Sequence, residues 1–107
     1  MPHPVLHKSP TIQDLQRYVA DTLRHRDLDA TSLSKNYLLL VEEVGELAKA
    51  IRKQEGVKFA TDTERKNVEH EIADVLFVLM SVCNILEIDA EQALRDKEEL
   101  NKLRAWT

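Results

Sequence analysis

Hydrophobic residues recur every three or four positions along most of the chain, which is the spacing of amphipathic helices. Residues 1–10 lack this spacing and hold all three prolines, so they read as an N-terminal tail. From residue 11 onward the spacing predicts helices over four segments: about Thr11 to Arg26, Ser32 to Gln54, Glu64 to Leu86 and Ala90 to Arg104. Because short connectors join these segments, we expect residues 11–107 to form a single all-α domain of four helices.

The third predicted helix is apolar on nearly all of its sides. Its stretch VLFVLMSVCNIL, residues 75–86, holds only two polar side chains. A helix of this kind must be covered all round, and three other short helices can hardly cover it. We therefore expect a homodimer or homotetramer, an oligomeric helical bundle in which part of this helix is buried between subunits.

The second predicted helix carries carboxylates beside its apolar stripe, in the stretch VEEVGELAKAI, residues 41–51. Each residue turns a helix by about 100°, so with Leu40 at zero Glu43 falls at about −60° and Glu46 at about −120°. Ala50 lies between them at about −80°, whereas Glu42 falls at about −160°, beside the lysines. Two of the three glutamates therefore flank the core, and Glu42 lies at the edge of the solvent face.

A second acidic pair lies on the third helix, where Glu71 and Asp74 share a stripe with Val78. Consecutive helices can pack antiparallel, which would bring this pair together with Glu43 and Glu46. Four carboxylates buried together would repel one another and lose hydration. A divalent cation removes both costs, and ligands that are all oxygen favour Mg²⁺, Mn²⁺ or Ca²⁺.

The carboxylates also allow two other interpretations. They could be ordinary surface charges that pair with nearby lysines, although two inward-tending pairs on consecutive helices argue against this. A di-iron bundle needs Glu-x-x-His on two helices. No histidine follows any of these glutamates at the third position, so the sequence does not predict a di-iron site.

Charge and composition narrow the class of partner. The formal net charge is −4 and there is no long Lys/Arg run, which argues against a nucleic-acid partner. The longest apolar run is too short for a membrane helix, which needs about 20 residues. Cys83 is the only cysteine, so no intrachain disulfide forms, and it reads as a small core residue. We expect a soluble, cytoplasmic protein, able to bind a small anionic molecule through a bridging cation.

The stretches EEVGELAKAIRK and EHEIADVLFVLM resemble the MazG-like family of all-α nucleoside triphosphate pyrophosphohydrolases. The signature of that family is Glu-x-x-Glu followed by Glu-x-x-Asp, and here 24 residues separate Glu46 from Glu71. The resemblance extends from about Leu33 to the end of the fourth predicted helix.

The resemblance implies a site and a reaction. The matching carboxylates, which would bind Mg²⁺ or alternatively Mn²⁺ and so hold a triphosphate, are Glu43, Glu46, Glu71 and Asp74. The implied reaction splits the α–β phosphoanhydride of a nucleoside triphosphate, giving a nucleoside monophosphate and pyrophosphate, as a nucleotide-pool housecleaning enzyme does. The base that activates water would be Glu42 or one of the four ligands, such as Glu43.

The fourth predicted helix carries a strip of hydrogen-bond donors. Lys97, Asn101 and Arg104 lie on one side of it and suit phosphate oxygens. The family carries a comparable Lys and Asn after its acidic motifs. Alternatively, Lys97 and Arg104 are solvated or pair with acidic neighbours. Asn36 lies two turns before Glu43 on the same side of its helix and is a further candidate for binding substrate.

Two other functions remain open at this point. Phosphoribosyl-ATP pyrophosphohydrolase of histidine synthesis resembles the same motif pair and fold. A non-catalytic helical interaction module could also keep this fold without binding metal. The nucleobase site is weakly marked, because Tyr37, Phe59 and Trp106 are either stacking partners for a base or plain packing residues.

Overall fold

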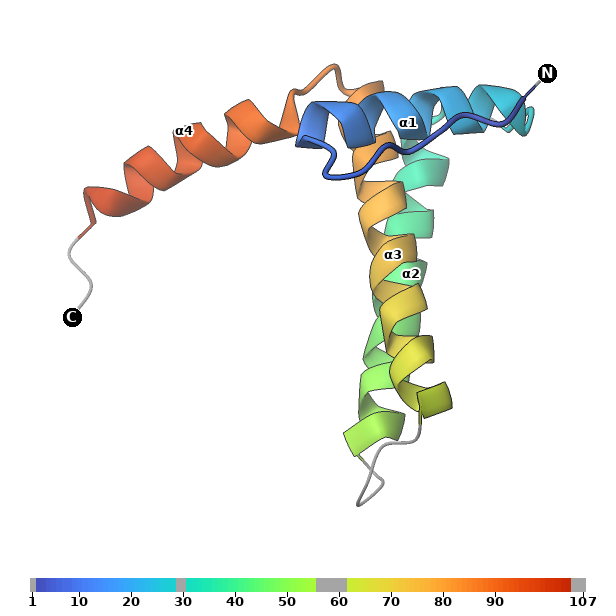
Figure 1. Ribbon diagram of the computed structural model, residues 1–107. Coiled ribbons are helices and arrows are strands. Elements are labelled where there is room, and N and C mark those ends of the chain that lie inside the picture. The colour runs from blue at the N-terminus through green and yellow to red at the C-terminus, as the bar shows by residue number, and fades with distance from the viewer. Residues whose placement is uncertain (1, 29–30, 56–61, 105–107) are drawn as a thin grey trace.

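The computed structural model describes residues 2–28, 31–55 and 62–104. These residues form four helices: α1 (Ile12–His25), α2 (Leu33–Glu55), α3 (Asp62–Ile85) and α4 (Ala90–Lys102) (Figure 1). The predicted all-α class and helix order are confirmed, and each helix ends within two residues of its predicted limit. Within the described segments, no helix is long and apolar enough to cross a membrane.

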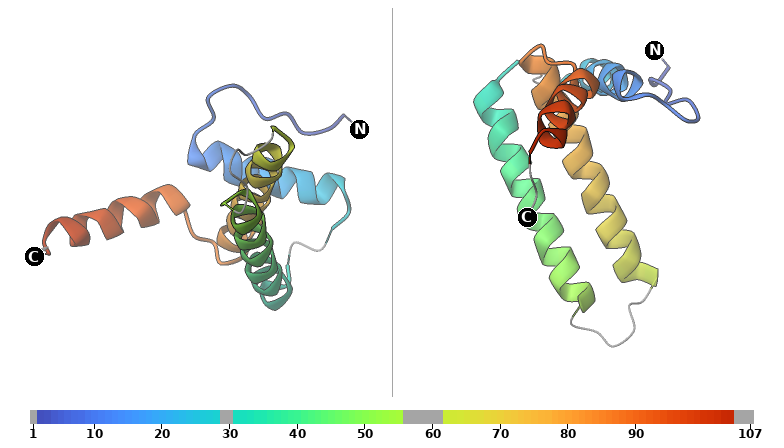
Figure 2. Two further views of the ribbon diagram at one scale, coloured as in Figure 1. Left: turned by 90° about the horizontal axis from the view of Figure 1, so that it is seen from below. Right: turned by 90° about the vertical axis from the view of Figure 1, so that its left-hand side faces the viewer.

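The helices α2 and α3 form an antiparallel hairpin, which is the most extensive helix contact of the chain (Figures 1 and 2). Leu40 and Leu47 are half-buried in it, and Val78 is buried. A buried polar contact also joins the two helices, because Ser81 Oγ donates to Asn36 Oδ1 at 2.8 Å. A buried hydroxyl and amide must be hydrogen-bonded, so this contact fixes the register of the hairpin.

The hydrophobic core lies where α1 crosses the end of α3. Its buried members are Val19 and Leu23 of α1 and Met80 of α3. Half-buried side chains surround them, including Phe77 and Cys83. Burial raises the pKa of the Cys83 thiol, which agrees with the prediction of an unreactive packing residue.

The ends of the helices follow local rules. Thr11 and Asp14 form a capping box, in which Asp14 N donates to Thr11 Oγ1 at 3.0 Å and Thr11 N donates to Asp14 Oδ2 at 2.9 Å. The helix α3 ends at Ile85, and Glu87, two residues further on, has a left-handed φ of 56°. Ile88 N then donates to Cys83 O at 2.9 Å, the bond that closes a Schellman turn.

The turn between α3 and α4 is fastened to α1 by side chains. Gln16 Nε2 donates to Asn84 Oδ1 at 3.0 Å and to Ile88 O at 2.9 Å, and Gln16 Oε1 accepts from Ala90 N at 2.9 Å. Asn84 Nδ2 donates in return to Gln16 O at 2.8 Å. Both ends of the Gln16 amide are therefore used, and they hold the end of α3 and the start of α4 at once.

A second glutamine supports the same turn. Gln13 Nε2 donates to Asp89 Oδ2 at 3.0 Å, and Asp89 Oδ1 accepts from Gln92 N as the cap of α4. These hydrogen bonds lower the pKa of Asp89 below its ordinary value, and the bond from Gln13 has the largest effect. The direction in which α4 leaves the hairpin is thus set by hydrogen bonds from two successive turns of α1.

The helix α4 points away from the hairpin, and its main helix contact is with α1 (Figures 1 and 2). The chain is correspondingly extended, with a radius of gyration of 16.5 Å against about 13 Å for a compact domain of this length. Leu94 and Leu100 of α4 are exposed, and so is Leu103, which caps its end. Within one chain, the four helices do not close into a bundle.

We expect Gln16→Ala to lower the free energy of unfolding by about 1–3 kcal/mol, because it leaves half-buried partners on Asn84 and Ala90 without bonds. Chemical denaturation at one fixed protein concentration measures this. Gln13→Ala is the matched control, since it removes one exposed bond and should cost less. Equal costs for the two variants would contradict a special role for Gln16.

Candidate metal centre

Three of the predicted carboxylates meet across the hairpin. Glu43 comes from α2, and Glu71 and Asp74 come from successive turns of α3. Each offers one oxygen, and these three oxygens lie within 4.8 Å of one another. Oxygens bound to a single Mg²⁺ at its usual bond length lie at most about 4.2 Å apart. Small side-chain rotations would therefore let all three contact one ion.

The helix packing explains why these groups lie together. Glu43 faces α3 because it shares a side of α2 with the half-buried Leu47 and Ala50. Glu71 faces α2 because it shares a side of α3 with Val75 and Val78. The regular period of the two helices thus carries the two carboxylates into the hairpin interface.

The negative charges of the clustered carboxylates act on one another without a cation to balance them among the described residues. The pKa of Glu43 is raised above its ordinary value of 4.5, first by burial and then by the charges of Asp74, Glu71, Glu46 and Glu42, in that order. Glu71 Oε2 is buried and has no hydrogen-bond partner among the described residues. A divalent cation would give that oxygen a partner and offset the repulsion, so the residues fit a metal such as Mg²⁺.

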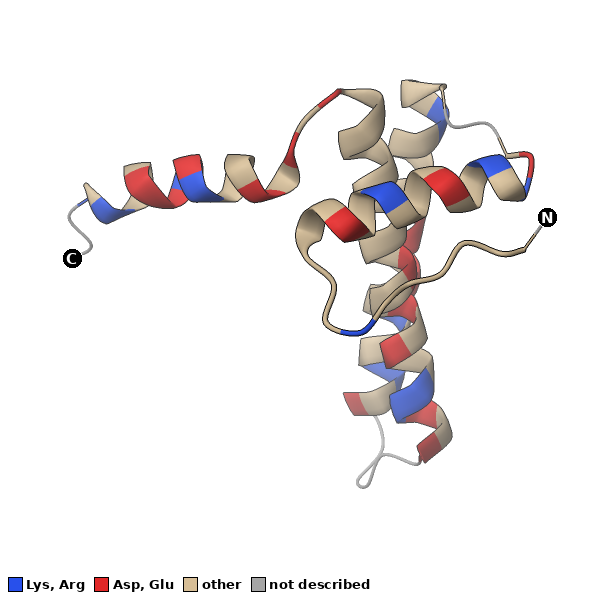
Figure 3. Cartoon of the chain, turned by 45° about the horizontal axis from the view of Figure 1, so that its top comes forward, with Lys and Arg blue, Asp and Glu red and all other residues tan. Residues whose placement is uncertain are grey.

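Two further glutamates stand beside the cluster on α2. Glu46 and Glu42 are exposed, and both raise the pKa of Glu43. Glu46 is not among the three groups whose oxygens meet. Figure 3 shows residues of both charge signs along the hairpin and along α4. The carboxylate cluster thus opens to solvent on the side where Glu42 and Glu46 lie.

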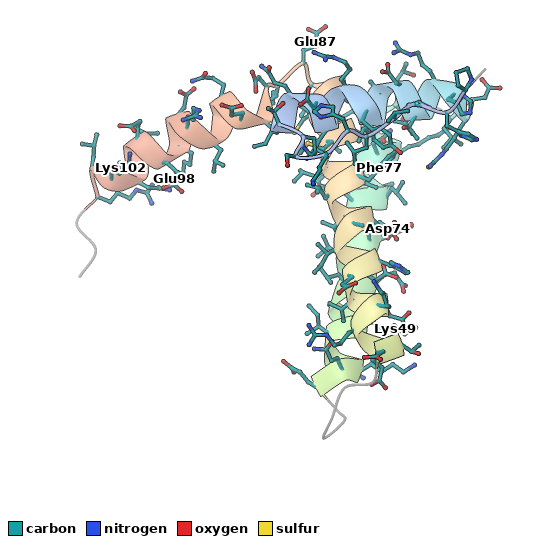
Figure 4. The ribbon with its side chains drawn as sticks, viewed as in Figure 1. Lys49, Asp74, Phe77, Glu87, Glu98 and Lys102 are labelled. Carbon is teal, nitrogen blue, oxygen red and sulfur yellow. The ribbon has the colours of Figure 1, made fainter. Side chains whose placement is uncertain are left out.

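The predicted phosphate strip is not brought to these carboxylates within one chain. On α4, Lys97 is exposed and Asn101 is half-buried, and Arg104, two residues beyond the end of the helix, is exposed. Figure 4 shows Glu98 and Lys102 at the far end of that helix, remote from Asp74 on the hairpin. Whatever these α4 side chains bind, they do not share a site with the carboxylates of their own chain.

Asn36 lies inside the hairpin interface and is 7% exposed. Its Nδ2 donates to Ser32 O at 2.8 Å, and its Oδ1 accepts from Ser81. Its amide therefore joins α2 to α3, and a contact with substrate stays a prediction. Of the aromatic candidates, Tyr37 is exposed on α2, and Phe59 and Trp106 lie outside the described residues.

Sequence reasoning missed the polar residues that orient these helices. Ser81 and Asn84 stand alone in an apolar run, and that isolation was the available signal. Both prove to be hydrogen-bonded to another helix, Ser81 to Asn36 and Asn84 to Gln16. A lone polar side chain in a buried helix indicates a partner of this kind.

We expect Glu43→Gln to raise the melting temperature of the metal-free protein at pH 7 to 8 and to prevent further stabilisation by Mg²⁺. Folding raises the pKa of Glu43, so its charged form destabilises the folded chain. The gain from the variant should therefore shrink as pH falls through that raised pKa, and vanish below the ordinary carboxyl range. Thermal unfolding with EDTA or Mg²⁺ across this pH range measures both effects.

Glu69→Gln is the matched control for Glu43→Gln, because Glu69 is exposed on α3 and pairs with Lys66. This control should be stabilised by Mg²⁺ as the wild type is. A Glu43→Gln protein that is still stabilised by Mg²⁺ to the wild-type extent would exclude the metal centre.

Comparisons with known proteins agree with the geometry. The MazG nucleotide pyrophosphohydrolase domain model matches residues 31–104. The dCTP pyrophosphatase 1 of Bos taurus is 31% identical over 100 residues, covering 89% of this chain and 59% of its own length. The Bacillus subtilis protein YpjD is 47% identical over 55 residues, half of each chain. This chain thus spans less than two thirds of the mammalian relative.

A solved structure gives the same fold. The crystal structure of iMazG from Vibrio DAT 722 superposes with a TM-score of 0.67 at 29% identity, covering 92% of this chain and all of the other. The residues that the family model matches include the carboxylate hairpin and α4 alike. The chain therefore belongs to the MazG nucleotide pyrophosphohydrolase domain family.

Proposed function

We propose that the protein hydrolyses a nucleoside triphosphate at the α–β phosphoanhydride, in a Mg²⁺-dependent reaction that gives a nucleoside monophosphate and pyrophosphate. The observation that carries this proposal is the meeting of Glu43, Glu71 and Asp74 around a buried, unpartnered carboxylate oxygen. These residues lie within residues 31–104, the range that the family model matches.

The chain would supply the ligands for the metal. Glu43, Glu71 and Asp74 would hold the cation, and Glu46 would join them as a fourth ligand from the solvent side. Bound Mg²⁺ neutralises phosphate charge and lowers the pKa of a coordinated water; Mn²⁺ would serve in the same way. The hairpin packing keeps these side chains in place before substrate arrives.

Glu42 is the stronger candidate for the general base. A carboxylate that holds a cation is a weaker base than a free one, which disfavours Glu43, the other candidate. Glu42 is exposed and adjoins the cluster. As water oxygen bonds to the α-phosphorus, the bond to the bridging oxygen breaks and its electron pair leaves with pyrophosphate. The proton of the water passes to Glu42.

The substrate that we propose to test first is dCTP, because the mammalian relatives carry the name dCTP pyrophosphatase 1. A small, acidic enzyme of this kind would act on free nucleotides in the cytoplasm, as a housecleaning activity. Phosphoribosyl-ATP is the competing substrate, since its pyrophosphohydrolases resemble the same motifs. Neither reaction requires a nucleic acid or a membrane.

We also propose that the protein is a homodimer, or a tetramer built from such dimers. The chain exposes 8544 Å², whereas a compact monomer of 12.3 kDa exposes about 6,100 Å². The excess, about 2,400 Å², is what each subunit of a large obligate homodimer buries. The described core is small, with only Val19, Leu23, Val78 and Met80 as buried nonpolar side chains.

The surface that a second copy would cover lies along α3. Ile72, Leu76 and Leu79 are 51%, 43% and 40% exposed, and they share one side of the helix. Asp74 lies at about 160° from Leu76 around the helix axis, so the apolar and acidic sides of α3 are opposite. A second hairpin can therefore pack on the apolar side without covering the carboxylates.

We expect the wild type to release pyrophosphate from dCTP with Mg²⁺ and to lose that activity with EDTA. Glu71→Gln and Asp74→Asn should each lower kcat/KM at least about a hundredfold, because each removes a metal ligand. The assay compares dCTP, the other deoxynucleotides, ATP and phosphoribosyl-ATP side by side. Glu69→Gln is the control and should keep wild-type activity.

No pyrophosphate release from any of these nucleotides, or wild-type rates in both ligand variants, would reject the proposed reaction and favour a non-catalytic interaction module. Preference for phosphoribosyl-ATP over dCTP would assign the competing reaction to the same carboxylates.

We expect a solution mass of at least twice 12.3 kDa by size-exclusion chromatography with light scattering. Leu76→Asp should shift the wild type toward monomer, because it places a charge in the proposed interface. Arg65→Asp on the exposed first part of α3 is the control and should keep the wild-type mass. A monomeric wild type would refute the dimer.

A further inference from the structure

We infer that the buried hydrogen bond between Asn36 and Ser81 sets the spacing of the carboxylate cluster and so makes the cluster select Mg²⁺ over the larger Ca²⁺. The two residues form a positioning pair, which holds Glu43 of α2 against Asp74 of α3. The inference rests on the proposed function and deepens it, because it names what determines the choice of metal. In this role the pair acts through the carboxylates and touches neither the metal nor the substrate.

The first support is the identity of the residue that α2 buries. The helix α2 lies wholly within the described residues, and Asn36 is its one buried residue although the helix is rich in Leu and Val. Asn36 is 7% exposed, and its partner Ser81 is 2% exposed. A buried amide and a buried hydroxyl cost free energy unless they are hydrogen-bonded. Two apolar side chains would avoid that requirement, so stability alone does not explain the pair.

The second support is the equal spacing along the two helices. Glu43 lies seven residues after Asn36, and Asp74 lies seven residues before Ser81. Seven residues advance a helix by about 10.5 Å and make nearly two whole turns, short by about 20°. The helices run antiparallel and side by side (Figure 2), so alignment of the buried pair entails alignment of the two carboxylates. The hydrogen bond and the metal cluster therefore share one register.

The third support is that the amide of Asn36 is held at both ends. Its Nδ2 donates to Ser32 O, just before α2 begins, at 2.8 Å, and its Oδ1 accepts from Ser81 Oγ at 2.8 Å. Hydrogen bonds weaken steeply when their length or direction changes. An amide that is fixed by its own helix and bonded to the next one therefore leaves α2 and α3 little freedom to slide.

The fourth support is the force that this bond opposes. Oxygens of Glu43, Glu71 and Asp74 lie within 4.8 Å of one another, and Glu71 Oε2 is buried without a partner among the described residues. Their mutual repulsion favours a slide or a separation of the two helices. Apolar contacts resist a slide weakly because they are non-directional, whereas a buried polar pair in a helix interface specifies the register.

The consequence for the metal follows from the sizes of the two ions. Mg²⁺ requires nearly ideal octahedral geometry at about 2.0–2.1 Å, whereas Ca²⁺ accepts six to eight oxygens in flexible geometry at about 2.3–2.6 Å. A slide by one residue would displace Glu43 by about 1.5 Å relative to Asp74, and a fraction of that exceeds the tolerance of about 0.2 Å for metal–ligand distances. Loss of register therefore penalises Mg²⁺ more than Ca²⁺.

The test measures metal binding by the nucleotide-free protein. Thermal unfolding at increasing MgCl₂ or CaCl₂ gives a dissociation constant for each ion. Ser81→Ala should weaken Mg²⁺ binding at least about tenfold, the usual cost of removing a group that orients a metal ligand. It should weaken Ca²⁺ binding less than about threefold, because the coordination of that ion is flexible. Glu71→Gln should weaken the binding of both ions, which places them at the cluster.

A second variant separates register from stability. Asn36→Leu combined with Ser81→Ala replaces both partners by apolar groups, which leaves neither of them unpaired. This double variant should recover stability relative to Ser81→Ala and still bind Mg²⁺ weakly. Gln16→Ala is the matched control, because it removes hydrogen bonds between other helices. It should lower stability while it binds Mg²⁺ as the wild type does.

The outcomes are distinct. Wild-type Mg²⁺ binding by Ser81→Ala, or an equal loss for Mg²⁺ and Ca²⁺, would overturn the inference. A double variant that regains Mg²⁺ affinity together with stability would overturn it too, since the pair would then act through stability alone. A wild type that binds Mg²⁺ but releases no pyrophosphate would reject only the proposed reaction, because the two dissociation constants decide the inference without catalysis.

Discussion

The rest of the structure depends on one constraint: α2 and α3 hold several carboxylates close together in spite of their mutual repulsion. Glu43 and Glu71 occupy positions in the α2–α3 interface that an ordinary hairpin would give to hydrocarbon. Burial and neighbouring charge raise the pKa of Glu43, which shows that the chain carries an electrostatic cost at this point. Sites of this kind give up stability in exchange for affinity toward a cation.

The position of these carboxylates in the interface also determines which apolar side chains of α2 are exposed. Because Asn36 and Glu43 face α3, the apolar stripe of α2 is only partly buried in the hairpin, where Leu40 and Leu47 are half-buried, and its other side chains are turned outward. Tyr37 and Val44 of that stripe are 57% and 48% exposed. The acidic interior of the hairpin and its apolar exterior are thus two results of one helix rotation. The homodimer that we propose would cover hydrocarbon exposed by the same rotation that builds the carboxylate cluster.

Much of this could be predicted from the sequence, because helix period is a local property. The four helices, the capping box at Thr11 and the convergence of Glu43 with Glu71 and Asp74 follow from spacing alone. The direction of α4 could not be predicted. It depends on a left-handed residue, Glu87, in place of the usual glycine, and on bonds between residues more than 65 positions apart.

The small size of the core has one more consequence, because only four nonpolar side chains are buried among the described residues. In the dimer that we propose, most of the hydrocarbon of α3 is covered only after two chains meet, so folding and association become a single equilibrium. The stability of each chain then depends on how many copies surround it. Dilution would act on this protein as a denaturant, and a cell could remove it simply by making less of it.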